Sequence, residues 1–444
     1  MKPYYTKNFM EKARCKLIEE TAIRENQMYY TLPLVSDRCM LTLNILNRHS
    51  EHRFPRRYMI INTRMISFRH ELLILGVILA EEPEELVYLT ILQNELWVGC
   101  SVDTDQSYLS RYAYFALFNL LRYSGEYKFQ DFYWPGFFNP KTGRSKYLLI
   151  KKSGDSLSVS PRDGYSGFYK PGEQLLTIRD SIGEPKLITP IIKETVPQGN
   201  DRGLGFCLSD TNNVRFNNNH YPFLVAHTGI LTKDKAAIKS FVDTISDTEN
   251  LSNISVSAEQ QQLLKLCHRM RAIAKIENPE YNDEPDLVAE KNKQNNNHFS
   301  ELFTLWRQAL PLLAGRLYTY YRYTFGMRHI KGKPRKSDMI PCRFSNEKPK
   351  LCFRWTDKRE YFKLELQVML NGRPYPITRN YNTAFFITRF DNPRVYHLLN
   401  NMMDYDLVKF FHDRQYQILF LKVHYDNYCK HFVQQLRKLY LFIK

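Results

Sequence analysis

Residues 96–121, LWVGCSVDTDQSYLSRYAYFALFNLL, decide the fold of the first part of the chain. The stretch begins with a run of strand-forming residues that ends at Cys100. A polar link at 101–107 follows, and the rest is rich in Ala, Leu, Phe and Tyr, as is typical of a helix. The sequence therefore predicts a strand, a turn and a helix. The apolar residues expected to pack this unit are Leu96, Val98, Leu109, Phe115, Leu117 and Leu120.

The same stretch resembles the SWIM zinc finger, whose pattern is Cys-x-Cys on a strand and then Cys-x-His at the start of a helix. Cys100 stands at the first ligand position, but the other three positions hold Val102, Ser110 and Tyr112. A structural zinc site takes four N or S ligands, so a lone thiol cannot hold zinc here. We expect a degenerate finger without metal and no other cofactor. An unrelated strand-turn-helix unit in an ordinary core fits these residues equally well.

Length and composition place the chain among globular proteins. It has 444 residues, of which 43% are hydrophobic, and this is enough for two or three packed domains. No run reaches the length of a membrane span, and the first residues lack the apolar core of a signal peptide. The eight cysteines include no CxxC pair. We therefore expect a cytoplasmic protein without a membrane partner or a disulfide framework.

Positive charge is concentrated in the last third of the chain. The net charge is +17, and residues 301–444 carry 26 Lys and Arg against 11 Asp and Glu, a surplus of 15. This asymmetry indicates a nucleic acid or another acidic partner. A basic footprint is not specific, so a domain that is merely basic and soluble is the alternative.

Two basic segments, 48–57 and 328–336, are the candidate sites for nucleic-acid binding. Each phosphate that they neutralise would add about one unit to the salt dependence of binding. Solvated connectors are the competing interpretation of both segments. The candidate residues are Arg53, Arg56, Arg57, Arg328, Lys331, Lys333, Arg335 and Lys336.

The pattern along the chain predicts a multi-domain α+β protein with antiparallel sheets that helices cover. The predicted segments are 1–145, an α+β domain with the SWIM-like unit; 146–277, a β-rich segment followed by helices; 278–297, a polar linker; and 298–444, a basic α+β domain. Before the linker we expect helices at 10–23, 228–245 and 257–276, and strands at 29–35, 40–46, 146–151, 174–178, 187–192 and 221–225.

The last segment has the clearest local signals. A helix is expected at 298–323 with a kink at Pro311. Apolar residues then alternate along 351–355 and 362–368, and Asn371-Gly372 follows as a hairpin turn. The remaining expectations are a strand at 383–389, helices at 396–403 and 406–412, a strand at 416–423 and a final helix at 425–443.

An aromatic stretch, FQDFYWPGFFNP at 129–140, is expected to be an irregular loop because it contains Pro and Gly. Exposed aromatic rings can stack on bases. A lid of aromatic residues that packs on the core is the alternative.

The order PKLCFRWTDKREYFKLELQVMLNGRPY, AFFITRFDNPRVYHLLN, DLVKFF and FVQQLRKLY is similar to the region that precedes the ATPase core in Snf2-family helicases of the Bacteroidetes type. The resemblance covers roughly two thirds of the chain. A P-loop needs GxxxxGK and then Ser or Thr; the string at 326–333 is one residue too long and Pro334 follows it. No DEAH-like pair occurs either. We therefore expect a free-standing front half of such a helicase that does not hydrolyse ATP.

Other catalytic patterns are weak. Cys267 and His268, like Cys429 and His431, would diverge on a helix. Asp404, Asp406 and Asp413, with Glu365, could supply the carboxylates of a metal-dependent nuclease, but helix caps or solvated acids explain them more simply.

Three functions remain open from the sequence. The first is a non-catalytic, helicase-associated accessory protein that binds nucleic acid, with DNA favoured. The second is a protein-interaction scaffold that docks a separate ATPase or another partner. The third, and the least favoured, is the divergent nuclease.

Overall fold

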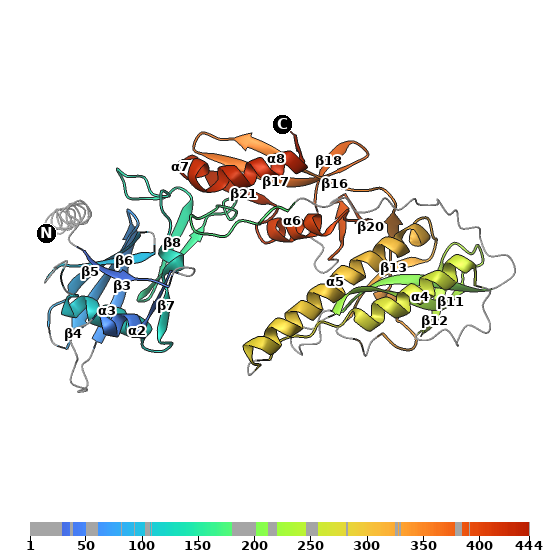
Figure 1. Ribbon diagram of the computed structural model, residues 1–444, viewed down its shortest axis with the longest axis horizontal. Coiled ribbons are helices and arrows are strands. Elements are labelled where there is room, and N and C mark those ends of the chain that lie inside the picture. The colour runs from blue at the N-terminus through green and yellow to red at the C-terminus, as the bar shows by residue number, and fades with distance from the viewer. Residues whose placement is uncertain are drawn as a thin grey trace, which may run out of the picture. The chain divides into compact units, whose positions relative to one another are not determined.

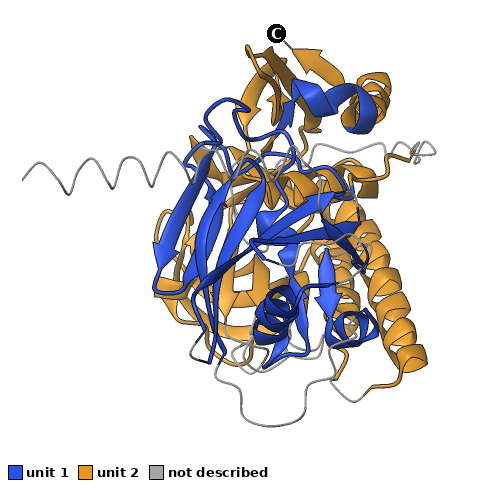
Figure 2. Cartoon of the chain, turned by 90° about the vertical axis from the view of Figure 1, so that its left-hand side faces the viewer, with its two compact units in different colours: residues 1–174, 419–428 blue, residues 175–418, 429–444 orange. Residues whose placement is uncertain are grey.

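The computed structural model describes residues 29–35, 39–49, 61–80, 82–92, 94–102, 107, 109–179, 201–211, 220–245, 256–280, 283–324, 327, 330–377, 384–389 and 391–443. Helices make up 29% and strands 41%, in several antiparallel and mixed sheets, which confirms the predicted α+β class. The chain forms two compact units (Figure 2). Unit 1 comprises residues 1–174 and 419–428, and unit 2 comprises residues 175–418 and 429–444.

Unit 1 is built on a five-stranded antiparallel sheet. Its strand order is β1-β6-β5-β4-β3, so strands that follow one another along the chain also pair in space. Strand β4, which lies between β5 and β3, is buried along almost its whole length, as its sequence LLILGVIL requires. The strands are β1 (Tyr30–Pro33), β3 (Ile61–Arg69), β4 (Leu72–Leu79), β5 (Glu85–Leu92) and β6 (Glu95–Cys100).

Helix α3 (Arg111–Leu121) packs against this sheet, and so the predicted strand, turn and helix are confirmed. Of the six residues expected to pack the unit, five are buried and Leu120 is half-buried. The smaller elements of unit 1 are β2 (Met40–Thr42), α2 (Leu43–Arg48), β7 (Glu126–Lys128), η1 (Phe129–Phe132), β8 (Leu148–Ser153), β9 (Ser156–Pro161) and α7 (Lys422–His424).

The aromatic stretch lies in the core of unit 1. Five of its six rings are buried, and Tyr133 is half-buried. The ring of Phe68 on β3 lies 5.3 Å from that of Phe132 and 5.1 Å from that of Phe138. The packing interpretation is confirmed, and these rings are not available to stack on bases.

Unit 2 contains a five-stranded sheet that two long helices cover on one face (Figure 1). The strand order is β12-β11-β10-β13-β14, with β13 parallel to β10. Leu204, Phe206 and Leu208 of β10 share a hydrophobic core with Leu302 and Trp306 of α5. The elements are β10 (Arg202–Thr211), β11 (His220–Leu231), β12 (Ile238–Ile245), α4 (Ala258–Ile273), α5 (Pro285–Leu313), β13 (Thr319–Thr324), η5 (Lys336–Asp338) and β14 (Ile340–Pro341).

The rest of unit 2 holds two further sheets, ordered β15-β20-β19 and β18-β17-β16-β22, and the start of β21 pairs with β17. The predicted hairpin at Asn371-Gly372 is confirmed, with φ of 49° and 73° at the two residues. The elements are β15 (Arg343–Ser345), β16 (Lys350–Asp357), β17 (Tyr361–Leu370), β18 (Arg373–Pro376), β19 (Phe386–Arg389), β20 (Asn392–Leu398), α6 (Met402–His412), α8 (Lys430–Leu439) and β22 (Leu441–Ile443). The strand β21 (Gln417–Leu421) and the π-helical η6 (Tyr425–Cys429) each belong partly to unit 1 and partly to unit 2.

The polar linker expected at 278–297 is wrong, because most of it forms the first half of α5. Pro285 occupies the first turn of that helix, where its missing N–H costs nothing. Asn295 is buried and exchanges two hydrogen bonds with the backbone of Glu277, at 2.8 and 2.9 Å. A polar sequence can therefore form a helix when its few buried side chains are hydrogen-bonded to the backbone of a neighbouring segment.

Several predicted elements are also wrong. The segment 228–245 is the β11–β12 hairpin and not a helix, 319–323 is β13 rather than the end of a helix, and 396–398 closes β20. The strand expected at 40–46 stops at Thr42, whose side chain accepts from the N–H of Ile45 and caps α2. No strand forms at 174–178, and the final helix breaks into η6, α8 and β22. The helix at 10–23 and the strand at 187–192 lie outside the described residues.

Candidate functional site

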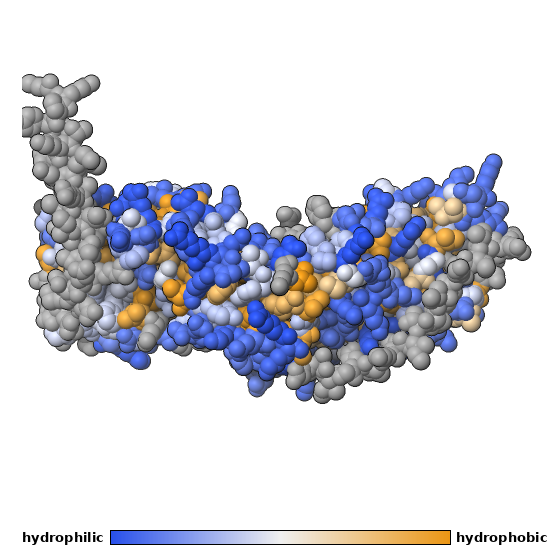
Figure 3. Space-filling model, turned by 90° about the horizontal axis from the view of Figure 1, so that it is seen from above, coloured by the Kyte–Doolittle hydropathy of each residue, from blue (hydrophilic) through white to orange (hydrophobic). Residues whose placement is uncertain are grey.

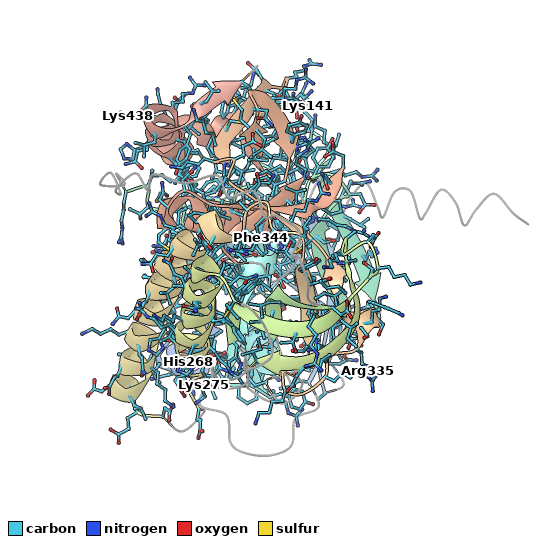
Figure 4. All side chains as sticks on the ribbon, turned by 90° about the vertical axis from the view of Figure 1, so that its right-hand side faces the viewer. Lys141, His268, Lys275, Arg335, Phe344 and Lys438 are labelled. Carbon is cyan, nitrogen blue, oxygen red and sulfur yellow. The ribbon has the colours of Figure 1, made fainter. Side chains whose placement is uncertain are left out.

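The second basic segment is exposed on unit 2. We call residues 330–336, between β13 and β14, the basic loop. Its cations Lys331, Lys333, Arg335 and Lys336 are all exposed, and Arg335 points outward from unit 2 in Figure 4. None of the four forms an ion pair within the part of the chain that the structure describes. Their charges are therefore not neutralised there.

The backbone of the basic loop is fixed although its cations face solvent. Ile330 and Pro334 are buried. The carbonyl of Gly332 accepts from the N–H of Thr244 at 3.0 Å and from its hydroxyl at 2.7 Å. Gly332 has a φ of +64°, a conformation that suits glycine. The loop thus presents its charges from a held backbone.

The other predicted residues cannot be placed. Arg328, Arg53, Arg56 and Arg57 lie outside the described residues. The structure therefore brings together four of the eight predicted cations, all from one segment of unit 2.

Side chains alternate between the two faces of the unit 2 sheet. The face that α4 and α5 cover is apolar. On the opposite face, Cys207 of β10 and Tyr320 of β13 pack with Phe241 of β12. Because Ser209 is aligned with Arg322 and follows Cys207 by two residues, both side chains belong to this opposite face, which we call the polar face.

The basic loop crosses the polar face. After β13 the chain passes to the other side of the sheet, where Gly332 of the loop accepts a hydrogen bond from Thr244 on β12. It then returns to form β14, which pairs with β13. Met339, at the end of this path, packs with Cys207 and Phe241. The polar face is consequently enclosed between the sheet and the loop.

The buried polar side chains on the polar face include those of Ser209, Thr211, His227 and Arg322. His227 of β11 is aligned with Gly205 and with Thr244, which places it on the same face. Within the described part of the chain, no hydrogen-bond partner is found for Ser209 Oγ, Thr211 Oγ1, either ring nitrogen of His227, or Nε and Nη1 of Arg322. Buried polar groups are normally paired, so this cluster is exceptional.

Burial also sets the protonation of this cluster. Burial, together with the smaller effect of the nearby charge of Arg322, lowers the pKa of His227 to about 3. The imidazole is therefore neutral near pH 7, with one nitrogen that donates and one that accepts. Burial raises the pKa of the Cys207 thiol well above its ordinary value, so this cysteine is a thiol and not a nucleophilic thiolate.

Three of the four SWIM positions, Cys100, Ser110 and Tyr112, have individual roles in unit 1. Cys100 is buried at the end of β6. Ser110 caps α3 by accepting from the N–H of Ala113 at 3.2 Å. Tyr112 donates to the carboxylate of Glu82, and this hydrogen bond, as the largest cause, together with burial raises the pKa of Tyr112 to about 12. Across the described residues, no group of three His, Cys, Asp or Glu side chains could hold a metal ion.

The acidic residues considered for a nuclease are tied to their neighbours. Asp404 is buried in the first turn of α6. Its carboxylate accepts a hydrogen bond from the hydroxyl of Tyr440 at 2.9 Å and another from the side-chain amide of Asn400 at 3.3 Å. Glu365 forms an ion pair with Lys363 at 2.8 Å. These contacts give Asp404 and Glu365 structural roles. Cys267 is buried while His268 on the same helix is exposed, and Cys429 and His431 differ in the same way.

No residue of the polar face was predicted as a site from the sequence. Its residues come from three strands, and Ser209 and Arg322 meet only through the parallel pairing of β10 and β13. The sole local signal is Arg322 itself, one cation within the aromatic run YTYYRYT.

Comparison of the chain with protein-family models, with curated proteins and with solved structures found no match. Among the described residues, no helix is long and apolar enough to span a membrane. Figure 3 shows hydrophilic residues over most of the face in view, with apolar residues scattered between them.

Proposed function

We propose that this chain is a non-catalytic accessory protein that binds nucleic acid, with DNA as the expected ligand, through phosphate contacts made by the basic loop. One observation carries the proposal. Four exposed cations lie within six residues on a held backbone, and none has a carboxylate partner among the described residues. Clusters of this kind neutralise phosphates and release bound counterions. The resemblance to the front region of Snf2-family helicases supports the accessory role.

The salt dependence of binding tests this proposal. If the four cations neutralise four phosphates, the slope of log K against log salt is about −3.6 for duplex DNA. Affinity then falls by roughly 150-fold between 50 and 200 mM salt. We expect this slope when binding of the purified chain to a fluorescent duplex is followed by anisotropy across a salt series.

The variant K331A/K333A/R335A/K336A removes the four charges. We expect it to bind weakly and to lose most of the slope. Its matched control is K141A/R144A/K151A/K152A, which removes four exposed cations of unit 1 and lowers the net charge equally. Equal losses in both variants would assign the binding to net charge and not to the loop.

The competing function is a protein-interaction scaffold whose basic loop meets an acidic protein. A packed protein interface depends only weakly on salt, because exposed charge pairs contribute little to its affinity. Absence of DNA binding at low salt would reject the nucleic-acid proposal and favour the scaffold.

A further inference from the structure

One edge of the four-stranded sheet in unit 2 is open and apolar. The strand order is β18-β17-β16-β22, and within the described residues β22 pairs on one side alone, parallel to β16. An edge strand presents unpaired N–H and C=O groups to which a further strand can bind. Leu441 of β22 is 52% exposed, the highest value for a large apolar side chain among the described residues of unit 2.

The opposite edge of the same sheet is protected. Its outer strand β18 carries Pro374 and Pro376. Proline is tolerated on an edge strand where its nitrogen faces outward, so the free edge of β18 lacks two donors. Prolines and charged side chains are the usual devices that keep sheet edges from pairing with other chains. The sequence of β22, LFI, contains neither.

Three positive side chains lie beside β22. Arg437 and Lys438 belong to the last turn of α8, and Arg354 of β16 is aligned with Ile443. All three are exposed, and none forms an ion pair within the part of the chain that the structure describes. The guanidinium of Arg437 lies 5.1 Å from the centre of the Phe442 ring. This open edge therefore carries positive charge close to the strand itself.

The two faces of β22 differ in chemistry, because side chains alternate along a strand. Leu441 and Ile443 point to one face. Phe442 points to the other, where its ring lies 5.4 Å from that of Phe353 and beneath Arg437. A strand added beside β22 would place alternate residues next to these two faces. Aliphatic residues match the first face, and carboxylates match the cation on the second.

We propose that β22 docks an extended segment of a partner protein in which aliphatic and acidic residues alternate. The segment extends the sheet by one strand, so that backbone hydrogen bonds supply affinity and the alternation supplies specificity. Nucleic acid has no backbone amides with which to continue the sheet. A second copy of β22 would bring the cations of two chains together, which is unfavourable. This docking does not depend on the basic loop, and the two proposals can fail separately.

A synthetic peptide is the probe. It has about eight residues, alternating Val and Glu, and carries a fluorescent label, so that anisotropy follows its binding to the full chain. One control peptide alternates Val and Lys, and the other has Pro in place of its two central Val residues. We expect the Val–Glu peptide to bind about tenfold or more tightly than either control, since Lys repels the cations and Pro removes backbone donors.

Two variants test the two faces of the strand. R437Q removes the charge over Phe442, and we expect about tenfold weaker binding with a smaller dependence on salt. L441T keeps a residue that suits a strand but loses apolar surface, and a severalfold weaker binding is expected. The matched control K430Q removes an exposed cation from the other end of α8 and should bind as the wild type does. Circular dichroism confirms folding, and if R437Q does not fold, L441T decides.

Hydrogen exchange shows whether the peptide adds as a strand. Amides of β22 should exchange more slowly when the peptide is bound, because an added strand protects an open edge. The loop variant K331A/K333A/R335A/K336A should keep peptide binding while it loses DNA binding, since none of its residues lies on β22 or α8.

The proposal is overturned if the wild type binds the Val–Glu peptide no more tightly than the controls, or if L441T and a folded R437Q bind it as tightly as the wild type. It is also overturned if light scattering shows a dimer that L441T dissociates, because the edge then pairs with a second copy. Loss of DNA binding in both R437Q and L441T, without peptide binding by the wild type, would assign the edge to nucleic acid instead.

Discussion

Replacing Arg322 by methionine should stabilise unit 2. The arginine is 6% exposed, and its Nε and Nη1 atoms have no partner among the described residues. Each unsatisfied buried donor costs about 1–3 kcal/mol, so the two cost about 2–6 kcal/mol. Methionine retains an unbranched apolar chain that fills irregular space and has no donors. We expect a gain of about 2 kcal/mol or more in the free energy of unfolding.

Hydrogen exchange is the suitable assay, because a chain of two compact units need not unfold in one step. Peptides from β10 and β13 report local opening of the sheet. A gain of about 2 kcal/mol slows their exchange by roughly 30-fold. The control R343M changes an exposed arginine on the nearby strand β15 and should stay within about 0.5 kcal/mol of the wild type.

The same substitution should raise the pKa of His227. Burial is the larger cause of its low value and the charge of Arg322 the smaller one. In R322M the pKa therefore rises but stays below the ordinary 6.5, which NMR titration of the imidazole can follow. A loss of about 3–5 kcal/mol in R322M, the cost of breaking a buried ion pair, would refute the reasoning and show that Arg322 already has an internal partner.

Two further predictions concern unit 2. Ser257→Ala should destabilise α4 by about 1 kcal/mol, because Ser257 and Gln260 form a reciprocal capping box. We expect faster hydrogen exchange that is confined to the first turn of α4, and unchanged exchange would contradict the prediction. Burial raises the pKa of Asp404 above its ordinary 3.8, against the opposing hydrogen bonds from Tyr440 and Asn400. The folded state therefore holds the proton more tightly, and this group's contribution to stability falls as pH rises above 3.8. Asp404→Asn should flatten that part of the pH profile in chemical denaturation, and an unchanged profile would assign the dependence to other groups.

The parts of the fold that local sequence specifies were predicted well. The β16–β17 hairpin follows from period-two alternation, and its turn follows from Asn371-Gly372, a pair that tolerates positive φ. The start of α4 follows from Ser257 and Gln260. In each case the information lies within a few neighbouring residues.

The β11–β12 hairpin was misread because its pairing is irregular. The register shifts between Thr228 and Gly229 and again between Ile230 and Leu231. These irregularities bury Ile238 and Phe241, three residues apart, on one side of β12. A bulged strand can therefore show the spacing of a helix.

Half of the candidate cations in the site were found from the sequence and are described in the basic loop. They were found because clustered like charges in a loop are visible locally. The buried cluster was not found, since Ser209 and Arg322 are more than a hundred residues apart and meet through a parallel pair. Exposed clusters of charge can thus be read from the sequence, whereas the buried polar side chains become apparent only from the topology.

The segments whose secondary structure was predicted wrongly are the ones that form much of the polar face. Segments 228–245 and 319–323, both expected as helices, supply β11, β12 and β13, and His227 and Arg322 lie on or beside them. Local preference and final structure normally agree, and disagreements concentrate at strained or functional sites. A strand that buries a charged arginine among tyrosines is unfavourable for folding by itself. Arg322 on β13, next to the central strand β10, therefore opposes the folding of the sheet, and the Arg322→Met measurement tests this inference first.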